Sequence, residues 1–210
     1  MIAPGQAWER YAEKARPRRR VNAAGASSWL NWTQYPDHGP NESILGSLPG
    51  QRVLELGSGA GANLAHLATL GARCIGVDVA PTRIHVARQN WAGLPNLEFV
   101  TGDATDYLTT TTDVFAVVYS IFGAVWFTDP ALLLPLVHRR LTSGGILAFS
   151  HLPPTERQRR SSPRSVTTWD YPPGRWVRML TATGFDSVTA EVIPAPTTGT
   201  GTLLVRALAP

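Results

Sequence analysis

Cysteine and lysine are scarce in this sequence, and each shortage excludes a class of chemistry. The chain has 210 residues and one cysteine, Cys74, so neither an internal disulfide nor a cysteine-rich zinc site can form. Lys14 is the one lysine among 19 basic residues. It follows no glycine-rich loop and no tyrosine precedes it by four positions, which excludes a Walker P-loop and a Tyr-x-x-x-Lys dehydrogenase pair. We expect an enzyme without a metal.

Long apolar runs are also missing. The longest, Val114 to Phe127, is interrupted by Ser120 and Gly123 and is too short to cross a membrane. No signal peptide precedes it, so we expect a cytoplasmic protein without a membrane partner. Hydrophobic residues make up 43% and charged residues 16%, which is enough apolar material for a folded core. The net charge of +4 suits an anionic partner or a solvated arginine-rich surface, and charge alone leaves both open.

Short apolar strands alternate with helical patterns from residue 52 onward. Such alternation predicts a doubly wound α/β fold whose parallel sheet is covered on both faces. The last two strands follow each other without a helix and should pair antiparallel, and residues 152–170 should form a polar loop. The predicted strands are Val53–Leu56, Cys74–Val77, Leu97–Val100, Val114–Tyr119, Gly145–Ser150, Val188–Ile193 and Thr202–Ala207; the predicted helices are Asn63–Leu70, Pro81–Trp91, Pro130–Leu141 and Pro172–Thr183.

The N-terminal part has a different character. Residues 1–20 show apolar side chains at helical spacing and end in a basic run. Residues 21–45 are rich in aromatic side chains, among them Trp29, Trp32 and Tyr35, which is unusual for a flexible connector. We therefore predict an N-terminal helical cap or lid over residues 1–45 and a cofactor-binding domain over residues 46–210.

A glycine turn carries the clearest chemical signal. Residues 55–61, Glu-Leu-Gly-Ser-Gly-Ala-Gly, follow a strand and open a helix, where a backbone without side chains can approach a ligand closely. Asp78 ends the next strand and could accept both hydroxyl protons of a ribose. Glycines at this spacing also fit a nicotinamide dinucleotide site. Glu55, however, would repel a pyrophosphate and attract an ammonium group.

Together with Asp103-Ala104 after the third strand, these residues resemble class I S-adenosylmethionine-dependent methyltransferases across residues 50–207. The resemblance implies a seven-stranded sheet with the last strand reversed, and S-adenosyl-L-methionine as the cofactor. Tyr119-Ser120 falls where the family's fourth-strand motif lines the methionine end of the cofactor. The cofactor-binding residues that it implies are Glu55, Gly57, Ser58, Gly59, Gly61, Asp78, Val79, Asp103, Ala104, Tyr119 and Ser120.

The methyl acceptor is less defined by sequence. Tyr35, His38 and His151 are the candidate catalytic residues, and for either histidine a structural role is equally open. Trp32, Phe122 and Trp126 are candidate acceptor-binding residues. The segment after the fourth strand, residues 119–123, lacks the pattern of an adenine amino-methylase, and Cys74 lies in the wrong place for a cytosine-carbon methylase.

We therefore expect methyl transfer to an oxygen, nitrogen or carboxylate of a small molecule, such as a secondary metabolite. We expect no nucleic-acid partner, and a monomer or homodimer. The alternatives are an NAD(P)-dependent reductase and a protein of this fold that binds the cofactor without transferring a methyl group, because fold does not fix chemistry.

Overall fold

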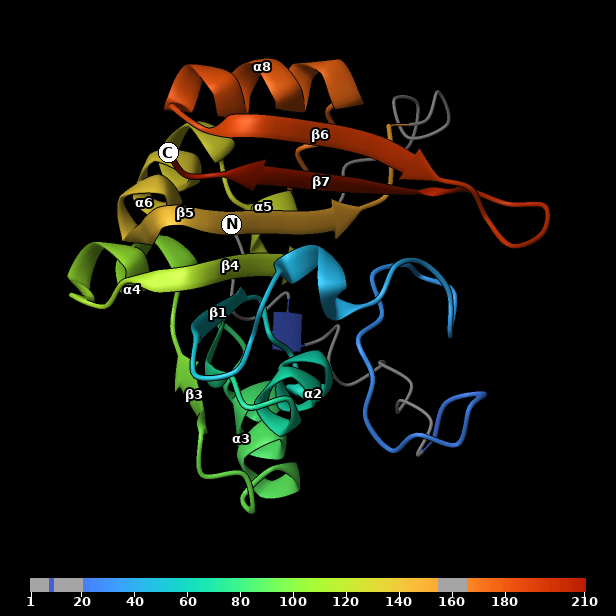
Figure 1. Cartoon of the computed structure of the whole chain (residues 1–210), viewed down its shortest axis with the longest axis vertical. Helices are drawn as coiled ribbons and strands as arrows, with labels where there is room; N and C mark the ends of the chain where they lie inside the picture. The colour runs from blue at the N-terminus through green and yellow to red at the C-terminus, as the bar shows by residue number, and fades with distance from the viewer. Residues whose placement is uncertain (1–7, 10–20, 155–165) are drawn as a thin grey trace.

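The computed structural model describes residues 8–9, 21–154 and 166–210 (Figure 1). Much of the helix predicted over residues 1–20 therefore lies outside the described residues. The elements alternate as the sequence predicts. In chain order they are η1 (Glu42–Leu45), β1 (Arg52–Leu56), α2 (Ala62–Thr69), β2 (Arg73–Asp78), α3 (Pro81–Asn90), β3 (Leu97–Thr101), α4 (Ala104–Thr110), β4 (Phe115–Ile121), α5 (Ala124–Phe127), α6 (Pro130–Arg140), β5 (Leu141–His151), α8 (Pro173–Thr183), β6 (Asp186–Ile193) and β7 (Thr202–Leu208).

The seven strands form one sheet in the order β3-β2-β1-β4-β5-β7-β6. Neighbouring strands from β3 to β5 are parallel, and β7 runs antiparallel to both β5 and β6. This confirms the mostly parallel, doubly wound sheet with a reversed last strand. Parallel strands end at a common edge, so the carboxyl ends of β1, β2, β3, β4 and β5 lie side by side there.

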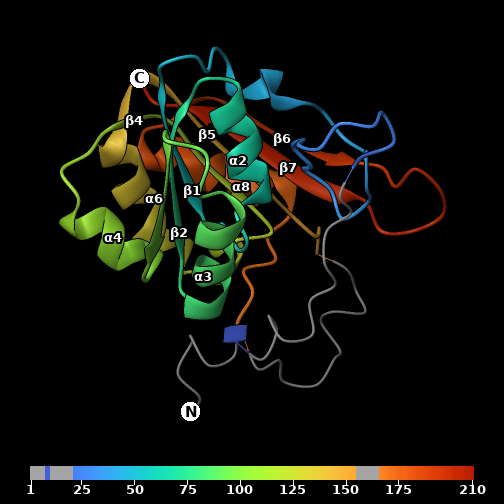
Figure 2. The ribbon, with the colours of Figure 1, turned by 90° about the horizontal axis from the view of Figure 1, so that it is seen from below.

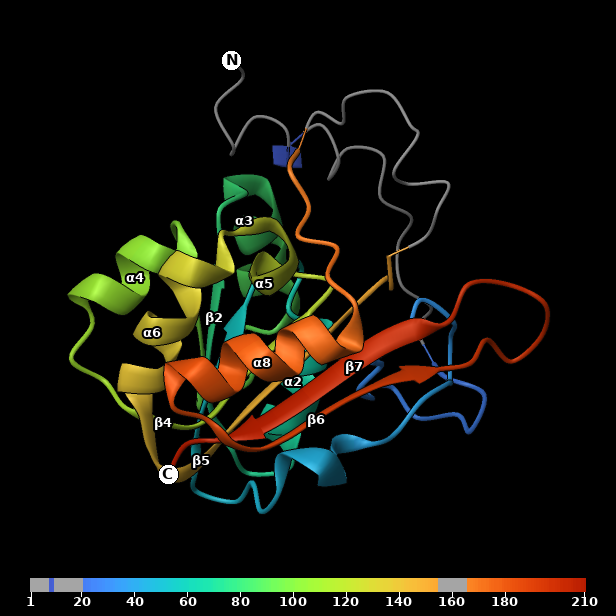
Figure 3. The ribbon, with the colours of Figure 1, turned by 90° about the horizontal axis from the view of Figure 1, so that it is seen from above.

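Helices cover both faces of the sheet, and each face has its own hydrophobic core. Helices α2 and α3 lie on one face, with α4 and α6 on the other (Figure 2). On that second face α8 crosses β6 and β7 (Figure 3), where its Trp176 and Leu180 join the core. The α/β layering thus buries both sides of the central strands, as their continuous apolar runs require. No helix in the described ranges is long and apolar enough to cross a membrane.

Two short helices were absent from the sequence prediction. Helix α4 begins directly after Asp103, whose carboxylate accepts hydrogen bonds from the amides of Thr105 and Asp106. Such a cap compensates for a helix that is rich in threonine, a weak helix former. Helix α5 has four residues, too few for helical periodicity to be visible.

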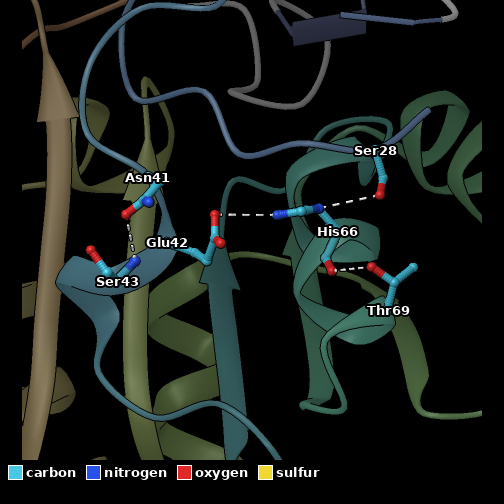
Figure 4. A network of polar contacts seen from close by, with 6 residues as sticks. All are labelled: Ser28, Asn41, Glu42, Ser43, His66 and Thr69. Atoms are coloured by element: carbon cyan, nitrogen blue, oxygen red, sulfur yellow. Dashed lines mark hydrogen bonds and ion pairs between the residues drawn. The ribbon is translucent and has the colours of Figure 1, made fainter. Parts of the chain in front are cut away.

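Residues 28–48 pack against α2 and the sheet. Trp32 and Leu45 are buried in the same core as residues of α2 and α3. The imidazole of His66 on α2 lies between Ser28 and Glu42, with Nδ1 3.2 Å from the serine hydroxyl and Nε2 3.3 Å from the carboxylate (Figure 4). This segment therefore contributes to the core beneath it. The domain boundary at residue 45 stays a prediction.

Cys74 offers a test of the central sheet. It lies in β2 between β1 and β3 and is 2% exposed. Burial, with a smaller contribution from the charge of Glu55, raises the pKa of its thiol to about 12. Because thiolate is the reactive form, we expect a thiol-disulfide reagent to label the native protein only as fast as it unfolds. The labelling rate should rise with urea, whereas rapid labelling in buffer alone would contradict this packing.

Candidate functional site

The glycine turn is fastened to the end of β2 by backbone hydrogen bonds. The amides of Gly57 and Ser58 donate to the carbonyl of Val77 at 2.8 and 3.1 Å. The amide of Gly59 donates to Oδ2 of Asp78 at 2.8 Å. Gly57, Gly59 and Gly61 have φ angles of 83°, 54° and 75°, a region that favours glycine. The structure thus brings the predicted turn residues and Asp78 together at the carboxyl edge of the sheet.

Asp78 keeps acceptor capacity beyond these bonds. Its Oδ1 accepts from the amide of Ala80 at 2.9 Å, so each carboxylate oxygen holds one amide. An ionised carboxylate has about four acceptor positions, which leaves room for two further donors. Burial raises the pKa of Asp78, and the two amide bonds and the charge of Arg83 oppose that rise. Val79 follows Asp78 and is half-buried.

An N-terminal residue reaches the same region. The amide of Thr82, in the first turn of α3, donates to Oε1 of Glu9 at 3.2 Å, and its hydroxyl bonds to Oε2. The negative charge of Glu9 adds to the raised pKa of Asp78. No sequence pattern predicts this contact, because it joins positions 73 residues apart.

Glu55, Tyr119 and Ser120 lie beneath the turn. Glu55 is 2% exposed and lies in register with Gly76 of β2 and Tyr119 of β4. Tyr119 is fully buried against the ring of Trp32, with ring centroids 6.1 Å apart. The hydroxyl of Ser120 donates to the carbonyl of Leu56 at 2.7 Å and accepts from the amide of Val125 at 3.3 Å. Ser120 therefore ties the ends of β1 and β4 to the first turn of α5.

Asp103 and Ala104 stand at the neighbouring strand end. Asp103 is exposed and caps α4, while Ala104 is buried. The amide of Gly102 donates to the carbonyl of Asp78 at 3.0 Å, which holds the end of β3 beside the end of β2. This capping role leaves the predicted adenine contact of Asp103 a prediction.

Aromatic rings gather beside this edge, and we call them the aromatic cluster. Neighbouring rings have centroids 4.4 to 6.1 Å apart. His151, the last residue of β5, stacks on Trp126 of α5 at 5.6 Å with planes 13° apart. Phe122 has a φ of 48°, unusual for a bulky residue, and its amide donates to the carbonyl of Ser150 at 2.8 Å. The members are Trp8, Phe122, Trp126, Phe127, Phe149, His151, Trp169, Tyr171 and Trp176.

Sequence reasoning identified Phe122, Trp126 and His151 but missed their partners beyond β5. Asp170 accepts a hydrogen bond from the indole nitrogen of Trp126 at 2.7 Å, and the amide of Trp169 donates to the carbonyl of Trp126. The available signal was the Trp-Asp-Tyr run at 169–171, an aromatic pair at the end of an otherwise polar loop.

Tyr35 and His38 form a separate pair. Their rings lie 5.8 Å apart, and the Tyr35 hydroxyl donates to the carbonyl of Thr200 at 2.9 Å. His38 contacts the Thr33 hydroxyl through Nδ1. Thr200 belongs to the β6–β7 connection, which projects from the end of the sheet where β5 also ends (Figure 1). The structure thus places this pair with the β6–β7 connection, while His151 lies in the aromatic cluster.

A cavity of about 300 Å³ lies elsewhere, between the end of α3 and the first half of β3. Its lining includes Arg88, Trp91 and Glu98. The indole N–H of Trp91 donates to the carbonyl of Ala60 in the glycine turn at 2.9 Å, but none of the predicted cofactor-binding residues lines this cavity.

Comparison with known proteins supports the resemblance that the motifs indicate. Residues 54–149, from β1 to β5, match the family model described as a methyltransferase domain. This part of the chain is similar to the methyltransferase domain that its motifs predict. The match supports S-adenosyl-L-methionine as the cofactor. It also favours the methyltransferase interpretation of the glycine turn over the dinucleotide interpretation.

Individual relatives of this methyltransferase domain match only part of their own lengths. A demethylmenaquinone methyltransferase of Clavibacter sepedonicus is 34% identical over 113 residues, which are 53% of this chain and 46% of that protein. The 23S rRNA (uracil(1939)-C(5))-methyltransferase RlmD of Shewanella sp. (strain MR-4) is 37% identical over 86 residues, or 40% of this chain and 16% of that protein. The chain thus spans less than half the length of these curated relatives.

A solved structure extends the similarity in fold. The putative S-adenosylmethionine-dependent methyltransferase from Listeria monocytogenes superposes with a TM-score of 0.67 over 80% of this chain and 95% of that chain. Their sequences are 19% identical, so the comparison supports the shared fold alone.

Proposed function

We propose that the protein transfers the methyl group of S-adenosyl-L-methionine to an oxygen, nitrogen or carboxylate atom of a small molecule that carries an aromatic ring. The observation that carries the proposal is the glycine turn locked onto Asp78, with the aromatic cluster beside it at the same edge of the sheet. The bound cofactor would supply an electrophilic methyl group on a sulfonium centre.

The strand-end residues fit this cofactor. The acceptor positions left on Asp78 would receive the two ribose hydroxyls. Glu55 would face the ammonium group, and Asp103 with Ala104 would meet the adenine. Ser58 adds a buried hydroxyl that has no hydrogen-bond partner among the described residues, so a ligand could satisfy it. Tyr119 and Ser120 would close the methionine end from below.

The aromatic cluster supports a flat acceptor. Rings of Phe122 and Trp126 lie 6.0 Å apart beside His151, a surrounding suited to an aromatic molecule. The name of the Clavibacter relative, demethylmenaquinone methyltransferase, also supports a small ring-bearing acceptor. The name of the Shewanella relative leaves RNA as the competing acceptor, which the experiment below includes. Trp32, fully buried beneath Tyr119, would shape this site from within the core.

Calorimetric titration with S-adenosylhomocysteine and with NADH tests the cofactor. We expect binding of S-adenosylhomocysteine and none of NADH; the reverse result would reject the proposal. Transfer of tritium from methyl-labelled cofactor should then be measured with hydroxy-, amino- and carboxy-arenes, and with an RNA transcript. Labelling of the transcript alone would move the acceptor to nucleic acid, and labelling of none would leave a cofactor-binding protein without transfer.

Replacing Asp78 with alanine tests the ribose role. The change removes the spare acceptor positions and the bond to Gly59, so we expect S-adenosylhomocysteine affinity to fall by about 1–3 kcal/mol, roughly fivefold to 150-fold. Asp113→Ala is the matched control, because Asp113 pairs with Arg52 at the opposite ends of β1 and β4. Calorimetry on both variants gives the comparison, and an unchanged affinity of Asp78→Ala would contradict the role.

A further inference from the structure

We propose that Nε2 of His151 binds and then deprotonates the hydroxyl of an aromatic acceptor. This inference rests on the proposed function and adds a substrate class, hydroxyarenes, and a catalytic base. It follows from the hydrogen bonds, burial and ring contacts of one residue.

The hydrogen bonds define which nitrogen of His151 is available. Nδ1 lies 2.7 Å from the carbonyl oxygen of Leu152. A carbonyl can only accept, so Nδ1 carries the proton and donates it. In the neutral ring Nε2 then holds a lone pair and is an acceptor. That atom is buried and has no hydrogen-bond partner among the described residues.

An unmet acceptor in this place is costly, because His151 is 0% exposed. The surrounding groups are rings: Trp126 stacks on one side, and Phe149 and Trp176 lie 6.1 and 5.6 Å away. A donor that satisfies Nε2 must therefore arrive on a molecule that fits among aromatic faces. A hydroxyl on an aromatic ring meets both conditions. The half-buried Trp126 indole marks the side on which such a molecule would approach Nε2.

The charges around the imidazole suit a base. Burial lowers the pKa of His151, which keeps the ring neutral and ready to accept a proton. The hydrogen bond to the Leu152 carbonyl and the negative charge of Asp170 oppose that shift, and the charge of Asp170 would stabilise the imidazolium once formed. Asp170 is held by Trp126 and by the Thr168 hydroxyl. Arg175 of α8 is turned toward the Tyr171 ring, 3.5 Å from its centroid.

The proton balance of the step is complete. As the acceptor oxygen forms its bond to the methyl carbon, the carbon–sulfur bond breaks and its electron pair stays on sulfur. The hydroxyl proton passes to Nε2, so the positive charge lost from the sulfonium appears on the imidazolium of His151. Release of that proton to solvent restores the base.

Binding of two matched probes tests the inference without turnover. The protein is saturated with S-adenosylhomocysteine and titrated with 2-naphthol and with 2-methoxynaphthalene, which lacks the hydroxyl donor. We expect 2-naphthol to bind about tenfold more tightly, the scale of one buried hydrogen bond. His151→Phe keeps a stacking ring without the acceptor and should remove the preference. His138→Gln should keep it, because His138 contacts Gly184 and Phe185 away from the cluster.

The pH dependence has a definite sign. Protonation turns Nε2 into a donor, so the preference for 2-naphthol should be constant above the ordinary histidine pKa and disappear only as pH falls through the lowered value. A preference lost on raising the pH from 6 to 8 would contradict the role of the neutral ring.

A spectrum of the native chain gives a readout that needs no variant. Nitrogen-15 labelling of histidine should show one ring with protonated Nδ1 and unprotonated Nε2 at neutral pH. The Nε2-protonated form, equal affinity for the two probes, or failure of both to bind would overturn the inference. If S-adenosylhomocysteine itself does not bind, the proposed function fails; if it binds and the probes show no preference, the assignment of His151 alone fails.

Discussion

Gly57→Ala is expected to destabilise the protein by about 2–5 kcal/mol and to abolish measurable binding of S-adenosylhomocysteine. A Cβ at this position would lie 2.6 Å from the amide nitrogen of Ala124 and 2.7 Å from Cα of Gly123. These are backbone atoms that cannot rotate away. The left-handed φ of 83° adds a cost of about 1–2 kcal/mol, and the overlap about 1–3 kcal/mol. Relief would require the turn to move away from α5, which would also break its bonds to Val77 and Asp78.

Substitutions at two further glycines distinguish the steric overlap of the added Cβ from the cost of a left-handed φ angle. Gly59 has a φ of 54°, but a Cβ there would meet nothing nearer than the Arg83 side chain at 3.6 Å. Gly50 has a φ of 75° and open space around it, away from the turn. Gly59→Ala and Gly50→Ala should therefore each cost about 1–2 kcal/mol, and Gly50→Ala should leave cofactor affinity unchanged. Thermal unfolding and calorimetry on all three variants are the measurements. If Gly57→Ala behaved like Gly50→Ala, the close approach of the turn to α5 would be wrong.

The contrast between these glycines shows what the sequence could predict. The turn was found because its signal is local: glycines between a strand and a helix, followed by an acid at the next strand end. A side chain at Gly57 is excluded by Gly123 and Ala124, at the start of the four-residue helix α5 and 66 and 67 positions later in the chain. No short-range pattern records such a contact, so the sequence predicted the turn and not its neighbour.

The fold was predicted for a related reason. The strands are short apolar runs bounded by turn residues, the long helices lie between them, and the elements alternate in a simple order. Helix α4 was missed because Asp103 was interpreted as a ligand residue, whereas its carboxylate caps the helix. One carboxylate can serve as a cap and as a ligand, and residue type alone does not separate the two.

The acceptor side was the least predictable part of the site. His151, Trp126 and Trp176 come from three elements of the sequence and meet only in the folded chain. In the sequence alone, each of these residues is equally consistent with packing in the core and with lining a pocket. What distinguishes His151 is the bond from its Nδ1 to the adjacent carbonyl, a backbone geometry that no sequence pattern encodes.

Trp32→Ala is expected to lower the free energy of unfolding by about 3–5 kcal/mol, as for other large aromatic side chains in a core. Trp32 is 0% exposed and packs on Tyr119, although it belongs to the segment interpreted from sequence as part of a lid. Its carbonyl accepts from the Ser150 hydroxyl at 2.7 Å, and this backbone bond survives the substitution. The loss of stability in this variant therefore measures the contribution of the Trp32 side chain alone. Urea unfolding with S-adenosylhomocysteine absent measures it without a contribution from the ligand.

Trp32→Phe is the matched control, because the indole N–H of Trp32 has no hydrogen-bond partner among the described residues. Phenylalanine keeps most of the ring and removes a buried unmet donor, so the change should cost less than about 1.5 kcal/mol. Trp29→Ala, at a half-buried position of the same segment, should cost about 1 kcal/mol. If this segment were a removable lid, all three substitutions would lower the free energy of unfolding only slightly. A large loss confined to Trp32→Ala would instead mean that this part of the N-terminal segment supports Tyr119, and through it the floor of the cofactor site.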